Sequence, residues 1–166
     1  VGAANFLQFQ RFLEGEDIVP LLYPGVEWYR VMGLISYLPS IAGLPQLRPE
    51  TYPDYWDRLE DFVALLHQHG KGVLFTCLCD IQISGQGVSE LRNYIAEVDD
   101  RIGGDENVLL SLGNEFFKNG WNPADFTKPP KGMWSRGTSN ADEAPPLPAW
   151  DFTEWEGRRD WPKVTS

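Results

Sequence analysis

The sequence predicts an α/β protein built around a parallel sheet. Short apolar runs alternate with amphipathic helices in the order strand, helix, strand, helix, strand. Right-handed crossovers in such a pattern place consecutive strands parallel to one another. The run at residues 72–80 is apolar almost throughout, which is typical of a strand covered on both faces. The length of 166 residues allows one domain with a real core, or two very small domains.

The first elements of this pattern lie near the amino end of the chain. Residues 6–9 form a short apolar run and predict the first strand. Asp17 is then a candidate N-cap for a short helix that runs to Leu22. Residues 28–33 are rich in aromatic and branched side chains, so they predict the second strand. A loop that contains several prolines is expected after it.

The helix after this loop is the clearest element of the sequence. Its apolar side chains recur at helical spacing and predict one buried face. The residues of that face are Tyr55, Trp56, Leu59, Phe62, Val63 and Leu66. Thr51 is a candidate N-cap, Pro53 suits the first turn, and Gly70 is suited to end the helix.

The pattern continues for one more helix and strand and then changes. Apolar residues three and four positions apart predict a helix over residues 88–102, and residues 107–115 predict the fourth strand. Residues 116–150 contain six prolines and no helical periodicity, so they predict a long loop region rich in proline and tryptophan. Short strands are expected at residues 133–135 and 150–155.

The composition argues against nucleic acid and membranes as partners. The chain has 24 acidic and 14 basic side chains, a formal net charge of −10, and no basic stripe that would neutralise phosphates. No apolar run approaches the ~20 residues that a membrane-spanning helix needs. A basic and apolar leader segment is not visible either, and the compartment stays undetermined.

No metal or organic cofactor is predicted. Cys77 and Cys79 alternate along a strand, where two small core side chains are a simpler interpretation than a disulfide or a metal pair. His67 and His69 are two residues apart near a helix end, so they do not share a helix face as paired metal ligands would.

Polar residues lie in or directly after three of the predicted strands. Arg30 lies within the second strand, Asp80 ends the third, and Asn114 with Glu115 ends the fourth. Functional groups gather at the carboxyl ends of parallel strands. A glutamate there is partly desolvated, which raises its pKa and lets it hold a proton near neutral pH. A protonated glutamate at this position could donate its proton to a glycosidic oxygen. The alternative is that Glu115 simply begins a loop and pairs with a cation such as Lys118.

The run at residues 108–115 resembles the fourth-strand Asn-Glu motif of clan A retaining glycoside hydrolases, the cellulase-like group of (β/α)8 barrels. Residues 28–33 resemble the second strand of that group, and residues 69–75 its passage from the second helix to the third strand. The resemblance implies a partial TIM-type barrel with parallel strands that lacks the last strands, as one incomplete domain over residues 1–166.

The same resemblance implies roles for individual residues. Glu115 would be the catalytic acid/base, and Asn114 and Arg30 would form its supporting polar shell. Asp80 would either bind substrate or cap the following loop. Three tryptophans would contact carbohydrate through their flat faces, or would instead anchor the proline-rich region. These are Trp121, Trp134 and Trp155.

The nucleophile of that group is a second glutamate, at the end of the seventh strand. This sequence predicts about six strands, and Glu154 and Glu156 fall near the sixth and match no nucleophile motif. A barrel typically takes ~250 residues, so the chain is expected to be a fragment of a longer hydrolase or a non-catalytic structural or carbohydrate-binding protein. An open barrel edge further predicts self-association or a partner chain that covers it.

Overall fold

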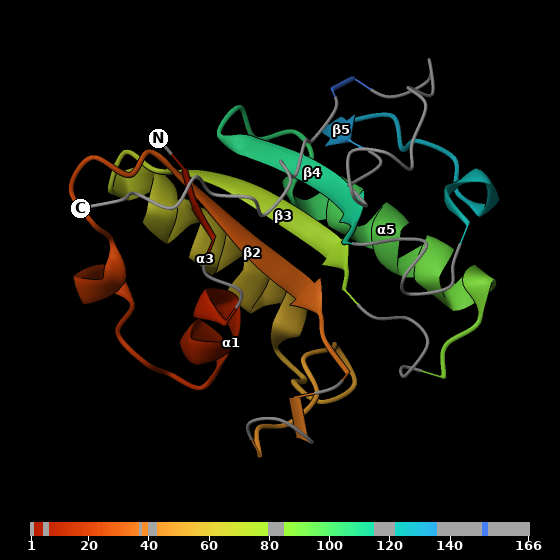
Figure 1. Ribbon diagram of the computed structural model, residues 1–166, viewed down its shortest axis with the longest axis horizontal. Helices are drawn as coiled ribbons and strands as arrows, with labels where there is room; N and C mark the ends of the chain where they lie inside the picture. Colours follow the sequence, from red (N-terminus) through yellow and green to blue (C-terminus); the bar gives the residue numbers. More distant parts are fainter. Residues whose placement is uncertain are drawn as a thin grey trace, which may run out of the picture.

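The computed structural model describes residues 2–4, 7–36, 38–39, 43–79, 85–114, 122–135 and 151–152. For residues 2–4 it describes the backbone alone. It shows an α/β architecture with a five-stranded parallel sheet in the order β1-β2-β3-β4-β5. The strands are β1 (Gly2–Ala4), β2 (Trp28–Leu34), β3 (Gly72–Leu78), β4 (Val108–Gly113) and β5 (Met133–Ser135), shown side by side in Figure 1. Within the described part of the chain, this sheet does not close on itself.

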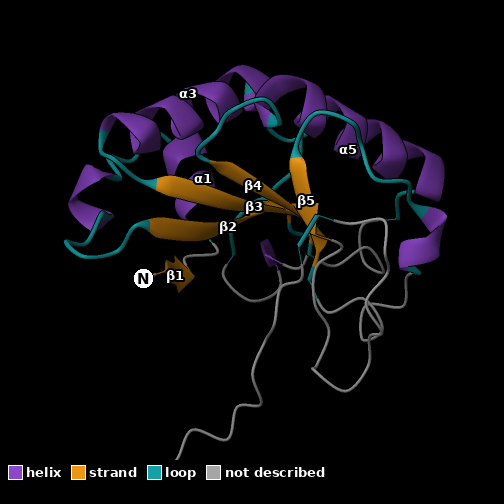
Figure 2. Ribbon diagram, turned by 90° about the horizontal axis from the view of Figure 1, so that it is seen from above, coloured by secondary structure: helices purple, strands orange, loops and turns teal. Residues whose placement is uncertain are grey.

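In the part of the chain that the structure describes, three α-helices lie on one face of the sheet, as Figure 2 shows. They are α1 (Gln8–Leu13), α3 (Tyr55–Gln68) and α5 (Val88–Ile102), with two short 3-10 helices, η1 (Val19–Leu21) and η2 (Pro123–Asp125). None of the described helices is both long enough and apolar enough to cross a membrane.

The parallel register sorts the strand residues into two faces. Val31 of β2 lies opposite Phe75 of β3, and Phe75 lies opposite Leu110 of β4; all three side chains are fully buried. The Phe75 ring contacts the Phe9 ring of α1 at 5.9 Å between centroids, so this face packs against the helices. Arg30 and its neighbour in register, Leu74, belong to the other face because successive side chains of a strand alternate.

The expectation of a first strand at residues 6–9 is corrected by the structure. The first strand is β1, and Gln8 and Phe9 begin α1 instead. Phe9 packs against the rings of Tyr55 and Phe62, and the spacing of Phe9 and Phe12 is that of one helix face. A short apolar run fits a helix face as well as a strand, so the pattern of residues 6–9 alone does not distinguish the two.

The later elements agree more closely with the sequence. The bounds of α5 are those predicted, and β5 covers residues 133–135 as expected. Helix α3 starts at Tyr55, later than a cap at Thr51 would place it, and Gly70 follows it with a φ of +65°. Asp17 accepts a hydrogen bond from the backbone N–H of Val19 at 3.0 Å, but the predicted N-cap and helix are corrected: Ile18 occupies the N-cap, and only a turn of 3-10 helix, Val19–Leu21, follows.

The sheet extends one residue pair beyond β5. Phe152 forms a parallel bridge with Ser135, and the backbone N–H of Asp151 donates to the Trp134 carbonyl at 2.9 Å. The expected sixth strand at residues 150–155 is described only at residues 151–152.

Candidate functional site

The side chain of Arg30 crosses from β2 to the end of β4. Its Nε donates to the Thr76 hydroxyl at 3.1 Å, and its Nη2 donates to the Asn114 carbonyl oxygen Oδ1 at 3.2 Å. Asn114 directly follows β4, and its backbone N–H donates to the Leu78 carbonyl at 2.8 Å. Residues from three strands are thereby joined by one guanidinium near the carboxyl-terminal edge of the sheet.

Arg30 can reach this edge because of its length and its register. It lies opposite Leu74, whereas Thr76 lies opposite Met32, one step further along the same face. The guanidinium therefore extends toward the carboxyl ends from a position in the first half of its strand. The planar fork of arginine fixes the angle between the two acceptors, so the geometry of the link is specific to this side chain.

A row of hydroxyl side chains continues from Thr76 across the sheet. Thr76 lies opposite Ser111 of β4, and Ser111 lies opposite Ser135 of β5. All three side chains are fully buried, and the Ser111 hydroxyl has no hydrogen-bond partner among the described residues. The sequence prediction missed this row, although Thr76 and Ser111 each interrupt an apolar strand and Ser135 ends the next strand at the same register position.

Several predicted site residues lie outside the described residues. Asn114 and Arg30 are brought together, but Glu115, the next residue in the chain, is not described. The same holds for Asp80, Trp121, Trp155, Glu154 and Glu156.

Trp134 is described and lies in the interior. Its side chain has no exposed area, and its indole N–H donates to Asp99 Oδ1 at 2.8 Å. A ring without an exposed face cannot stack on a sugar, so Trp134 packs the core in place of the expected carbohydrate contact. Asp99 is itself buried, and it accepts backbone hydrogen bonds from Gly132 at 2.8 Å and Lys131 at 3.0 Å.

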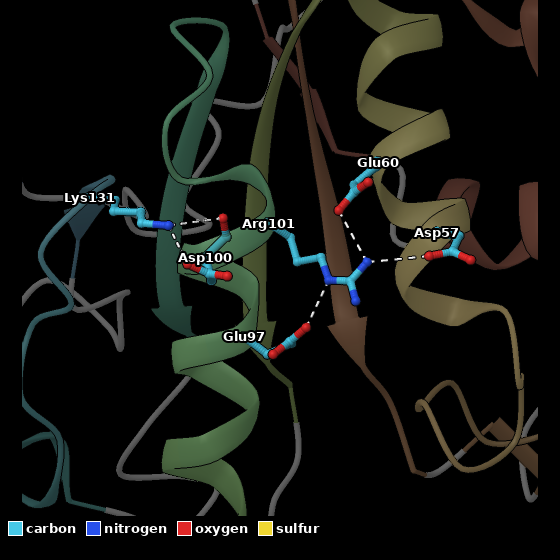
Figure 3. A network of polar contacts seen from close by, with 6 residues as sticks. All are labelled: Asp57, Glu60, Glu97, Asp100, Arg101 and Lys131. Atoms are coloured by element: carbon cyan, nitrogen blue, oxygen red, sulfur yellow. Dashed lines mark hydrogen bonds and ion pairs between the residues drawn. The ribbon is translucent and has the colours of Figure 1, made fainter.

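The outer surface of the helices carries ion pairs rather than a second candidate for catalysis. Arg101 of α5 donates to Glu97 on its own helix at 2.7 Å, and to Glu60 and Asp57 of α3 at 3.2 and 3.3 Å (Figure 3). The bond to Glu97 contributes most to a raised pKa of Arg101, which stays charged. These contacts hold α3 and α5 together.

Lys131 and Asp100 form a separate ion pair beside this network (Figure 3). The hydrogen bond from Lys131 is the main cause of a lowered pKa of the Asp100 carboxyl. Among the residues the structure describes, no three His, Cys, Asp or Glu side chains are grouped as a metal site would require.

Among the described residues, the Arg30–Asn114 link is the one arrangement of predicted site residues that the structure brings together, and it lies on the face of the sheet opposite the helices. Comparisons of the chain with models of protein families, with curated proteins and with solved structures find no match.

Proposed function

We propose that this chain carries the acid/base half of a glycoside hydrolase site on a partial (β/α) barrel. The strand order supports this scaffold, because five parallel strands follow one another in chain order with the helices on one face. In a (β/α) barrel the face opposite the helices is the interior, and the active site lies at the carboxyl ends of the strands. Arg30 and Asn114 meet on that side of the sheet.

The link between Arg30 and Asn114 is the observation that carries the proposal. Asn114, whose side-chain carbonyl Arg30 holds, directly precedes Glu115 in the chain. A guanidinium in this position would stabilise carboxylates of the site. Its bond to Oδ1 also fixes which end of the Asn114 amide faces Arg30.

In this mechanism Glu115 donates its proton to the glycosidic oxygen as the bond to the anomeric carbon breaks. A second carboxylate, ~5 Å from the first in retaining enzymes, attacks the anomeric carbon, and Glu115 then removes a proton from the water that releases the sugar. The proposal assigns no described residue to that nucleophile. Carbohydrate is the proposed ligand, and neither a metal nor an organic cofactor takes part.

The test is the substitution Glu115→Gln in the full-length gene product. Removing a general acid should lower turnover of natural glycosides by ~10²–10⁴-fold, and turnover of aryl glycosides with good leaving groups much less, because these need little protonation. Glu106→Gln, at an exposed position just before β4, is the matched control.

Equal turnover of the Glu115 and Glu106 variants on natural glycosides would contradict the assignment. A wild-type protein that binds oligosaccharides without hydrolysing any of them would also contradict it. That result would favour a carbohydrate-binding protein that uses a barrel scaffold without catalysis.

A further inference from the structure

A cavity of about 430 Å³ lies on the helix side of the molecule, between α5 and residues 126–131. This volume is within the range of small-molecule sites. Most of its wall is apolar, formed by Ile95, Ala96, Phe126, Pro129 and Pro130. The cavity is separate from the Arg30–Asn114 link, because none of its lining residues comes from the strands that Arg30 joins.

Two sets of hydrogen bonds hold the cavity open by fixing both ends of the segment that covers it. At one end, Nε and Nη2 of Arg92 both donate to the carbonyl oxygen of Asp125. At the other end, Asp99 accepts the backbone N–H groups of Lys131 and Gly132. The segment between these ties contains two consecutive prolines, which restrict its backbone. A binding site that is already formed loses less free energy on ordering when a ligand binds.

The charged side chains that line the cavity are three cations, Arg92, Lys128 and Lys131, and two carboxylates, Asp99 and Asp100. Lys128 is paired with Asp151 at 3.0 Å, and Lys131 is paired with Asp100. Arg92 bonds only a neutral carbonyl and forms no ion pair with any carboxylate in the described part of the chain. Its guanidinium has five N–H donors, so donors remain beyond the two bonds to Asp125.

We propose that this cavity binds a small organic anion with an apolar body, such as an arylalkanoate. The apolar body would lie against Ile95, Phe126 and Pro129, and the carboxylate would accept hydrogen bonds from Arg92. The Asp99 carboxylate would not repel the ligand strongly, because three N–H donors already compensate its charge.

The test compares phenylacetate with its neutral isostere phenylacetamide by following backbone amide shifts of the full chain in solution. Phenylacetate should shift the amides of residues 126–132 saturably and bind about tenfold more tightly than phenylacetamide, as a charge-assisted bond to arginine implies. Arg92→Gln should remove that preference and leave a weak, equal affinity for both probes. Arg11→Gln, an exposed arginine on α1, should leave the preference unchanged.

Filling the cavity gives an independent variant. Ala96 is exposed on α5, so Ala96→Leu keeps a good helix former and places its longer side chain in the cavity. It should abolish binding of both probes while the shifts of other regions stay native. Absence of saturable shifts at millimolar phenylacetate, equal affinity for the two probes in the wild type, or full binding by the Ala96→Leu chain would overturn the proposal.

Discussion

The indole N–H of Trp134 and the carboxylate of Asp99 form a hydrogen bond of 2.8 Å between two buried side chains, one from β5 and one from α5. The same carboxylate accepts the backbone N–H groups of the two residues just before β5. A buried charge is tolerated when hydrogen bonds satisfy it, and here three donors do so. Asp99 is thus the residue that fastens the last described strand to the helix layer.

Removing this carboxylate should destabilise the fold strongly. Asp99→Ala leaves three buried N–H donors without an acceptor, and we expect a loss of ~3 kcal/mol in the free energy of unfolding, measured by urea denaturation. Asp100→Ala, its exposed neighbour, removes only a surface ion pair that solvent screens and should cost far less than Asp99→Ala. Similar losses for the two variants would show that the three bonds to Asp99 contribute little.

A methyl group at Gly33 should disrupt the contact between β2 and α5. A Cβ there would lie 2.3 Å from the Tyr94 hydroxyl and 2.6 Å from the Phe75 ring. Gly33→Ala should therefore cost ~1–3 kcal/mol through overpacking. Gly104→Ala is the control, because a Cβ at Gly104 meets nothing within 4 Å.

The Tyr94 hydroxyl provides a check on the cause. It pairs with the Tyr55 hydroxyl at 2.7 Å, and Tyr55 donates to the Gly33 carbonyl at 2.8 Å. If the clash is with this hydroxyl, Tyr94→Phe should recover part of the Gly33→Ala loss in a double-mutant cycle. Strictly additive losses would point to the Phe75 ring instead.

The protein should lose stability in alkali, and Tyr52 should account for part of that loss. Burial is the main cause that raises the pKa of Tyr52 from 10.0 to about 12, and its hydrogen bond to Glu14 raises it further. The folded state therefore holds this proton more tightly than the unfolded state. The stabilisation is complete below pH 10 and is lost as the pH rises through about 12.

Tyr52→Phe should consequently show a shallower fall in the free energy of unfolding across that interval, measured by urea denaturation at several pH values. A residual fall should remain, because burial also raises the pKa of Tyr55 and Tyr94 well above the usual value. Tyr23→Phe, at an exposed position, controls for the loss of a hydroxyl elsewhere. An unchanged slope in the Tyr52 variant would contradict this account.

Thr76 should act as a positioning residue for Arg30. Thr76→Val keeps the shape of the side chain and removes the acceptor of Arg30 Nε, so the guanidinium should lose its fixed angle to Asn114. The Arg30 Nε–H proton should then exchange with solvent faster, which NMR can measure without any substrate. Thr76→Ser, which restores the hydroxyl, should restore slow exchange, and equal exchange rates in all three proteins would rule the role out.

The sequence predicted those elements whose signal is local. The apolar run of β3 and the periodicity of α5 each span enough residues to distinguish a strand from a helix. The four-residue run at residues 6–9 was too short for that, and the ring contacts that make Phe9 part of a helix come from α3 and β3. Tertiary packing decided the assignment there.

The candidate site likewise has one part that the sequence could predict and one part that it could not. The positions of Arg30 and Asn114 relative to their strands were predictable, and their meeting follows from the parallel register. The interior position of Trp134 was not predictable, because its hydrogen-bond partner Asp99 lies 35 residues earlier, on α5. The apolar spacing of that helix does not indicate that Asp99 is buried. Whether an aromatic ring is covered depends on such distant donors and acceptors.

The strand order of the sheet bears on how the chain folds during synthesis. Every described strand pairs only with the strands just before and just after it in the chain. When a new strand leaves the ribosome, the neighbouring strand with which it pairs has therefore already been synthesised. No described strand pairs with a strand that is distant in the sequence. The amino-terminal strands can serve as a template on which the rest of the sheet is added in order of translation.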